Sequence, residues 1–132
     1  METPFKIPVL TTDSTHISIF KEATFPETIR GGMILTDRIN AQNLRLRVSE
    51  PGYTSDWHVA GDPTLIIIQQ GTLRVILQDG SYKDFSAGDM FIAQDYLPED
   101  IAFDPSKHGH RAEVIGDEVL RAVHVKLKKR QT

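Results

Sequence analysis

Short runs of β-branched and aliphatic residues, interrupted at close intervals by glycine and proline, dominate this chain. Apolar residues rarely recur at the three-to-four spacing of an amphipathic helix. The Asp79-Gly80 pair is typical of a hairpin turn, because both residues tolerate positive φ. Short connections of this kind favour antiparallel pairing, so we predict an all-β barrel or sandwich. The expected strands span residues 44–48, 65–68, 72–78, 82–85, 90–94, 111–115 and 119–127.

Composition narrows the classes of function. The chain has 132 residues, and 15 Lys and Arg against 18 Asp and Glu give a formal net charge of −3. The length suits one domain, and a slightly acidic chain lacks the field that binds nucleic acid. The absence of cysteine excludes thiolate metal sites and thiol nucleophiles. The longest apolar run, Leu65–Ile68, is too short to cross a bilayer, and the first residues do not resemble a signal peptide, so we expect a cytoplasmic protein without a membrane partner.

The first 32 residues differ in character from the rest. They place Ile17, Ile19, Phe20 and Phe25 among proline and threonine, which predicts an extended N-terminal arm. Such an arm needs a surface to cover its apolar groups. We therefore divide the chain into an arm at 1–32, associated with a dimer, and one barrel domain at 33–132.

Five positions between residues 52 and 71 keep the spacing of a known metal-binding motif. The first motif of the cupin superfamily reads Gly, five residues, His-x-His, three or four residues, Glu, six residues and Gly. This chain resembles it with two of the three ligand types replaced. The positions are Gly52, His58, Ala60, Thr64 and Gly71.

A second stretch extends the resemblance. FSAGDMFIAQD, at residues 85–95, is similar to the turn and strand that open the second cupin motif. A long loop from Tyr96 to Gly109 follows, and it ends in a Gly-His pair. This pair favours His110 as the histidine of the second motif, and His108 is the alternative. The apolar residues of this loop fit either a lid over the barrel or contact with a neighbouring subunit. Together the motifs imply a small single-domain cupin, an RmlC-like jelly-roll β-barrel with a degenerate metal motif, and a homodimer.

Two histidines carry the chemistry that the resemblance implies. An imidazole in a partly apolar pocket titrates near neutrality, so His58 and His110 suit proton transfer on a small carbonyl or hydroxylated metabolite. This reading predicts a lyase, isomerase or cyclase. Two alternatives stay open. One is a weakly bound divalent metal (Fe, Mn, Ni or Zn) on the two histidines with water or Asp56, Asp62 or Asp95, for oxygenase or hydrolytic chemistry. The other is a non-catalytic barrel that binds a small molecule.

Strand alternation selects further candidates. Arg45 and Arg47 share one face of a strand and suit a carboxylate ligand, although a solvent-facing pair has the same pattern. Tyr53 and Trp57 flank His58 and would wall a ring-shaped ligand or simply pack. His124 alternates with Val123 and Val125, so we expect it to face outward. The candidate substrate-binding residues are Arg45, Arg47, Tyr53, Trp57, Thr64, Ile66 and Ile68.

Overall fold

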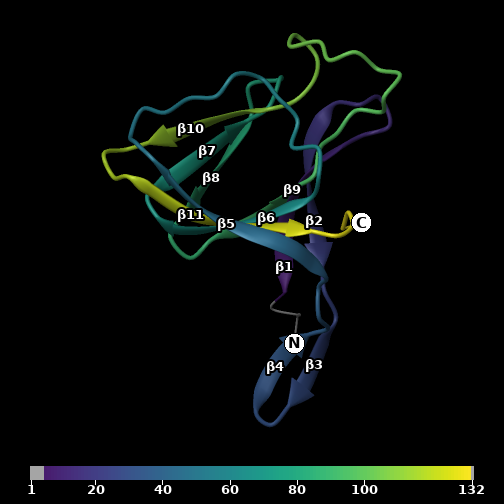
Figure 1. Cartoon of the computed structure of the whole chain (residues 1–132), viewed down its shortest axis with the longest axis vertical. Coiled ribbons are helices and arrows are strands. Elements are labelled where there is room, and N and C mark those ends of the chain that lie inside the picture. Colours follow the sequence, from purple (N-terminus) through teal and green to yellow (C-terminus); the bar gives the residue numbers. More distant parts are fainter. Residues whose placement is uncertain (1–4, 132) are drawn as a thin grey trace.

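The computed structural model describes residues 5–131 and consists of β-strands and their connections (Figure 1). Each strand expected from the sequence is present, which confirms the all-β prediction. Among residues 5–131 there is no helix with the length and apolar character needed to cross a membrane. The strands are β1 (Lys6–Thr12), β2 (Ser18–Thr24), β3 (Glu27–Arg30), β4 (Met33–Thr36), β5 (Ala41–Ser49), β6 (Thr64–Gln70), β7 (Thr72–Ile76), β8 (Tyr82–Ser86), β9 (Met90–Ala93), β10 (Arg111–Ile115) and β11 (Leu120–Leu127).

Two sheets enclose the core. A six-stranded sheet has the order β2-β1-β9-β6-β11-β5, and a three-stranded sheet has the order β10-β7-β8. All pairings are antiparallel except that of β1 with β9. Inward side chains of both sheets are buried against one another, and the rings of Phe85 and Phe91 stack with centroids 4.2 Å apart. This packing forms the core between the two sheets.

The N-terminal segment is part of the barrel for most of its length. β1 lies between β2 and β9, and its Val9 and Leu10 are completely buried. Residues 6–24, which the sequence assigned to an arm, therefore extend the six-stranded sheet. The segment that projects from the body is the hairpin of β3 and β4, residues 27–36, at the bottom of Figure 1.

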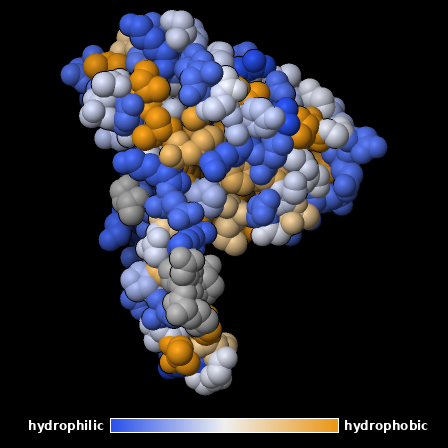
Figure 2. Space-filling view, turned by 180° about the vertical axis from the view of Figure 1, so that it is seen from behind, coloured by the Kyte–Doolittle hydropathy of each residue, from blue (hydrophilic) through white to orange (hydrophobic). Residues whose placement is uncertain are grey.

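β5 forms one edge of the six-stranded sheet, and its apolar side chains point away from the core. Leu44, Leu46 and Val48 are 62%, 76% and 57% exposed. The projecting hairpin also exposes apolar side chains, among them Ile29 at 72% and Met33 at 56%. Figure 2 shows hydrophobic atoms at the tip of this hairpin. The face of β5 that meets the barrel interior is instead the polar one, with Arg45 and Arg47.

Candidate functional site

His58 and His110 lie side by side, as the motif spacing predicts. An isolated antiparallel bridge joins them: the His58 amide donates to the His110 carbonyl at 3.0 Å, and the His110 amide donates to the His58 carbonyl at 2.8 Å. Because bridged residues of this kind face the same side, the two rings pack with centroids 4.4 Å apart at an angle of 52°. His110 is buried, with 6% of its surface exposed, whereas His58 is exposed.

Gly109 makes this close approach sterically feasible. Its φ is +81°, and a Cβ built on it would collide with the His58 carbonyl oxygen and lie 2.7 Å from the carbonyl carbon. A residue with a side chain would therefore push His58 away from His110. The Gly-His pair noted in the sequence thus has two roles: glycine admits the neighbouring backbone, and histidine supplies the ring.

Asp95 fixes the ring of His110. Its carboxylate is fully buried, and its Oδ2 accepts hydrogen bonds from His110 Nδ1 and from Ser18 Oγ, both at 2.7 Å. The other oxygen, Oδ1, accepts the Ala60 amide at 2.9 Å. An ionised carboxylate only accepts, so the proton of His110 is on Nδ1 and the Nε2 lone pair is left for a ligand.

The tautomer of His58 follows by the same reasoning. Its Nδ1 lies 2.8 Å from the backbone carbonyl of Asp56, which can only accept, so Nδ1 carries the proton. Neither Nε2 has a hydrogen-bond partner in the part of the chain that the structure describes. The site therefore holds two neighbouring imidazoles, one anchored by a carboxylate and one by a backbone carbonyl.

Both rings line an inner cavity of about 230 Å³ inside the barrel. Its floor is apolar and comes from both sheets, including Ile66 of β6, Val75 of β7 and Phe91 of β9. A small organic molecule with an apolar body fits such a lining. The residues around the cavity are Arg47, Tyr53, His58, Val59, Ala60, Thr64, Ile66, Leu73, Val75, Phe91, Ala93, His110, Ala112 and His124.

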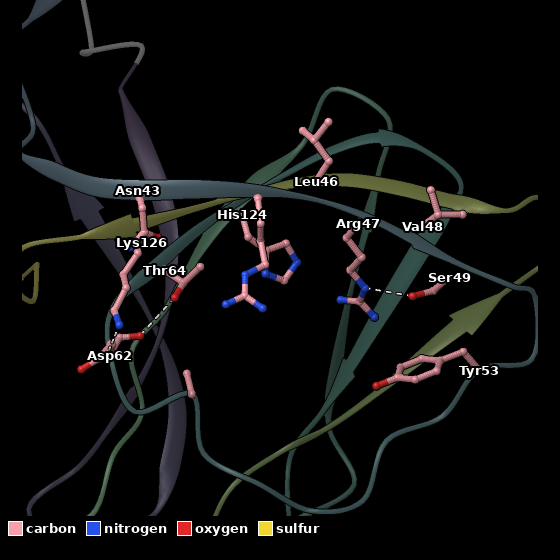
Figure 3. A pocket seen from close by; sticks show the side chains of 12 residues that line it. Asn43, Leu46, Arg47, Val48, Ser49, Tyr53, Asp62, Thr64, His124 and Lys126 are labelled. Carbon is pink, nitrogen blue, oxygen red and sulfur yellow. Dashed lines mark hydrogen bonds and ion pairs between the residues drawn. The ribbon is translucent and has the colours of Figure 1, made fainter.

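A wider outer cavity of about 630 Å³ adjoins the inner one, and the residues that line both are Arg47, Tyr53, Ala60, Thr64 and His124. Arg45 is exposed and Arg47 is half-buried, and both line this outer cavity. In Figure 3 the Arg47 guanidinium extends into the space below β5, whereas Leu46 points to the opposite side of the strand. The two cavities together lead from a cationic mouth to the histidine pair.

The expectation that His124 faces outward is wrong. On β11, His124 lies opposite Arg45 of β5 and opposite Ile66 of β6, and its side chain lines both cavities. Alternation with Val123 was read correctly, but the apolar side of this strand lies on the outer surface of the sheet. Burial, and next the charges of Arg47 and Arg45, lower the pKa of His124. Its Nε2 is buried without a hydrogen-bond partner.

Other predicted residues lie apart from the cavities. Ile68 is buried in the core at 1% exposure and lines neither of them. Trp57 lies on the outer side of His58, beside loop residues such as Leu97 and Phe103 in a shallow pocket. The Arg111 guanidinium is 5.8 Å from the Trp57 ring. Trp57 therefore supports the wall behind His58 rather than the inner cavity.

His108, the alternative to His110, has a structural role. Its Nδ1 accepts the Asp104 amide at 2.9 Å, and its own amide donates to the Asp104 carbonyl at 2.8 Å. Gln78 Nε2 donates to the His108 carbonyl at 3.1 Å, which ties the long loop to the barrel. His110 is thus the histidine at the site.

The residues present do not form a metal centre. Cupin-type sites use three or four side-chain ligands, and here only His58 and His110 converge. Asp95 already accepts three hydrogen bonds, Asp62 pairs with a lysine at 2.6 Å, and Asp56 turns its backbone carbonyl to His58. Across residues 5–131 no group of three His, Cys, Asp or Glu side chains is placed to hold a metal ion. The donor set does not fit a resident metal.

Sequence reasoning missed two members of the site. The sequence marked Asp95 only as a possible metal ligand. It did not mark Ser18, which donates a hydrogen bond to Asp95 from 77 positions away in the chain. The signal for Asp95 was its position directly after a buried strand, where a charged residue needs a partner.

Comparisons with known proteins concern the fold alone. No protein-family model matches the sequence, and no curated protein matches it. A cupin-2 domain protein from Shewanella frigidimarina is 18% identical, covers 69% of this chain and 78% of its own, and has a TM-score of 0.47. A cupin domain protein from Bordetella pertussis is 13% identical over 98% and 99%, with a TM-score of 0.47. The polyketide cyclase RemF from Streptomyces resistomycificus is 16% identical over 71% and 59%, with a TM-score of 0.48.

Proposed function

We propose that this protein catalyses proton transfer on a small carbonyl or hydroxylated metabolite, as a lyase, isomerase or cyclase. The observation that supports it most is the buried Asp95–His110 pair, with the His58 ring 4.4 Å from His110 at one cavity. A carboxylate on Nδ1 orients an imidazole and stabilises the positive charge that develops when Nε2 takes a proton.

The reaction step is an acid–base exchange at the carbonyl. Nε2 of His110 takes a proton from the carbon next to the carbonyl group, and the C–H electron pair forms the enol double bond. His58, in its protonated form, gives a proton from Nε2 to the carbonyl oxygen. Two positive rings at this separation would repel, so the transfer of a proton from His58 as His110 takes one avoids placing two charges side by side. Returning the proton to a different carbon gives isomerisation, and loss of a neighbouring leaving group gives elimination.

The experiment is hydrogen–deuterium exchange, followed by proton NMR in D₂O with a panel of small ketones, aldehydes and oxo acids. We expect exchange next to the carbonyl of at least one compound, with loss of that activity in His110→Asn. His16→Asn is the matched control, because His16 lies in the turn between β1 and β2 and its φ of 68° suits asparagine. Equal exchange by the wild type and His110→Asn would refute the mechanism. Ligand binding without exchange would favour the non-catalytic binding role.

We also propose that two copies pair through their exposed apolar surfaces. Leu44, Leu46 and Val48 lie on an edge strand, and an isolated two-stranded hairpin such as β3–β4 is marginal without packing. A second copy satisfies both surfaces at once through a two-fold axis. Light scattering should give the mass of a dimer for the wild type and a shift to monomer for Leu46→Glu. Tyr82→Glu, an exposed residue of the other sheet, should leave the dimer intact; a monomeric wild type contradicts the proposal.

A further inference from the structure

We infer that the ligand of this cavity carries a carboxylate, which Arg45 and Arg47 hold at the mouth while the rest of the molecule extends toward the histidine pair. The inference names the substrate class and rests on the proposed function only for the reacting end. The binding half stands on the geometry and charge of the outer cavity.

The two arginines form a convergent pair. They are separated by one residue on β5, so they project from the same face of the strand, and both line the outer cavity. Arg47 is half-buried, and its Nε donates to Ser49 Oγ at 2.9 Å. Its two terminal nitrogens stay available to a planar oxyanion, for which the guanidinium fork is suited.

No protein carboxylate neutralises this pair. Across residues 5–131, neither Arg45 nor Arg47 has an ion-pair partner. The neighbouring Lys126 is different, because its Nζ pairs with Asp62 at 2.6 Å (Figure 3). Arg74 on β7 is different too, since it makes two hydrogen bonds to Asp84. Among the cations that line the outer cavity, Lys126 is thus neutralised by Asp62, whereas Arg45 and Arg47 are left to an external anion.

His124 gives a second, independent sign of a missing ligand group. It lies directly across from Arg45, and its buried Nε2 has no hydrogen-bond partner. A buried polar atom without a partner is destabilising, and a ligand oxygen in the outer cavity would remove that cost. Burial lowers the pKa of Arg47 as well, which is the expected cost of a desolvated cation without a counter-charge.

The linings of the two cavities indicate the chemical character of the ligand beyond its carboxylate. The outer cavity is polar around the arginines, and the inner one is walled by residues such as Ile66, Leu73 and Phe91. Arg47 and Tyr53 line both. A carboxylate at the mouth therefore leaves a short apolar or carbonyl-bearing body within the inner cavity, beside His110. Small oxo acids have this chemistry.

The test compares three carboxylates with their amides: hexanoate, benzoate and succinate against hexanamide, benzamide and succinamide. Titrations are followed by amide chemical shifts in NMR. We expect at least one carboxylate to bind about tenfold more tightly than its amide, and Arg47→Gln to remove that preference. Arg121→Gln is the matched control, because Arg121 is exposed on the outer face of the adjacent strand. If no carboxylate binds more tightly than its amide, or if Arg45→Gln and Arg47→Gln both bind as the wild type does, the inference is overturned.

Failure of this inference is distinguishable from failure of the proposed function. His110→Asn should abolish proton exchange while keeping the preference for carboxylates. Carboxylate binding without any exchange would overturn the catalytic proposal and keep this inference. Exchange of neutral ketones as fast as that of oxo acids would overturn this inference and keep the catalytic proposal.

Discussion

Replacing Gly109 with alanine tests how the histidine pair is held together. The added Cβ would lie 2.7 Å from the His58 carbonyl carbon, whereas the optimal distance between two non-bonded carbon atoms is about 3.5–4.0 Å. The two segments must therefore separate by about 1 Å. Both backbone hydrogen bonds between His58 and His110, now 3.0 and 2.8 Å, would lengthen beyond a useful distance.

Two contributions make up the expected loss of stability. A non-glycine residue at a φ of +81° costs about 1–2 kcal/mol. Loss of the two hydrogen bonds adds about 0.5–1.5 kcal/mol each, for a total of about 2–5 kcal/mol. Gly116 separates the two contributions, because its φ is +80° and an added Cβ would meet nothing within 4 Å. Gly116→Ala should therefore lose only the first, about 1–2 kcal/mol.

Urea unfolding measures both variants. The single tryptophan, Trp57, reports the region beside His58, and far-UV circular dichroism reports the whole barrel. We expect Gly109→Ala to lose about 1–3 kcal/mol more than Gly116→Ala. Equal losses in the two variants would refute the claim that Gly109 is required by the approach of His58.

Three further changes test other parts of the account. In Asp95→Asn the amide presents an N–H to His110, so Nδ1 becomes an acceptor and Nε2 carries the proton. Proton exchange should therefore fall about a thousandfold, while circular dichroism shows a folded chain. Unchanged exchange would exclude Asp95 from the mechanism. Ser18→Ala leaves the His110 proton on Nδ1. We expect the free energy of unfolding in urea to fall by about 1–3 kcal/mol and proton exchange to fall by less than about tenfold. A fall in exchange as large as that of Asp95→Asn would contradict the roles assigned to the two residues. Because the pKa of His124 is lowered in the folded chain, the unfolded chain binds a proton at His124 more readily, and this residue destabilises the fold as pH falls below about 6.5. The urea midpoints at pH 7.5 and pH 5.5 should therefore differ less in His124→Gln than in the wild type. Equal differences in the two proteins would contradict this role of His124.

The strands could be predicted because the signals that define them are local. Glycine, proline and alternation act within a few residues, so the presence of β5 through β11 follows from the sequence, although β5 and β6 are longer than the expected spans 44–48 and 65–68. The pairing of His58 with His110 also followed, because the motif spacing places both at the same end of the barrel. These predictions needed no knowledge of which residues contact one another across the sheets.

The orientation of the β5 and β11 side chains could not be predicted in the same way. Alternation shows that Arg45 and Arg47 share a face, but not whether that face is the interior. The usual assumption that the apolar face is inside fails here, since Leu44 and Leu46 are exposed. His124 was assigned to the wrong side for this reason.

Long-range contacts account for the rest. Ser18 meets Asp95 only because β1 and β2 join the six-stranded sheet beside β9. Sequence reasoning had placed that segment in an arm, since its prolines and threonines give no partner strand. A buried acid such as Asp95 shows that a partner is needed, but not which residue provides it.

The position of the ring proton decides whether Nε2 of His110 can act as a base. Long-range proton–nitrogen correlation spectra of the ¹⁵N-labelled protein distinguish which ring nitrogen carries the proton, with no substrate required. We predict that the neutral form of the ring carries its proton on Nδ1, hydrogen-bonded to Asp95, and leaves Nε2 unprotonated. A proton found on Nε2, with Nδ1 unprotonated, would contradict the account, because His110 would then have no lone pair to offer in the cavity.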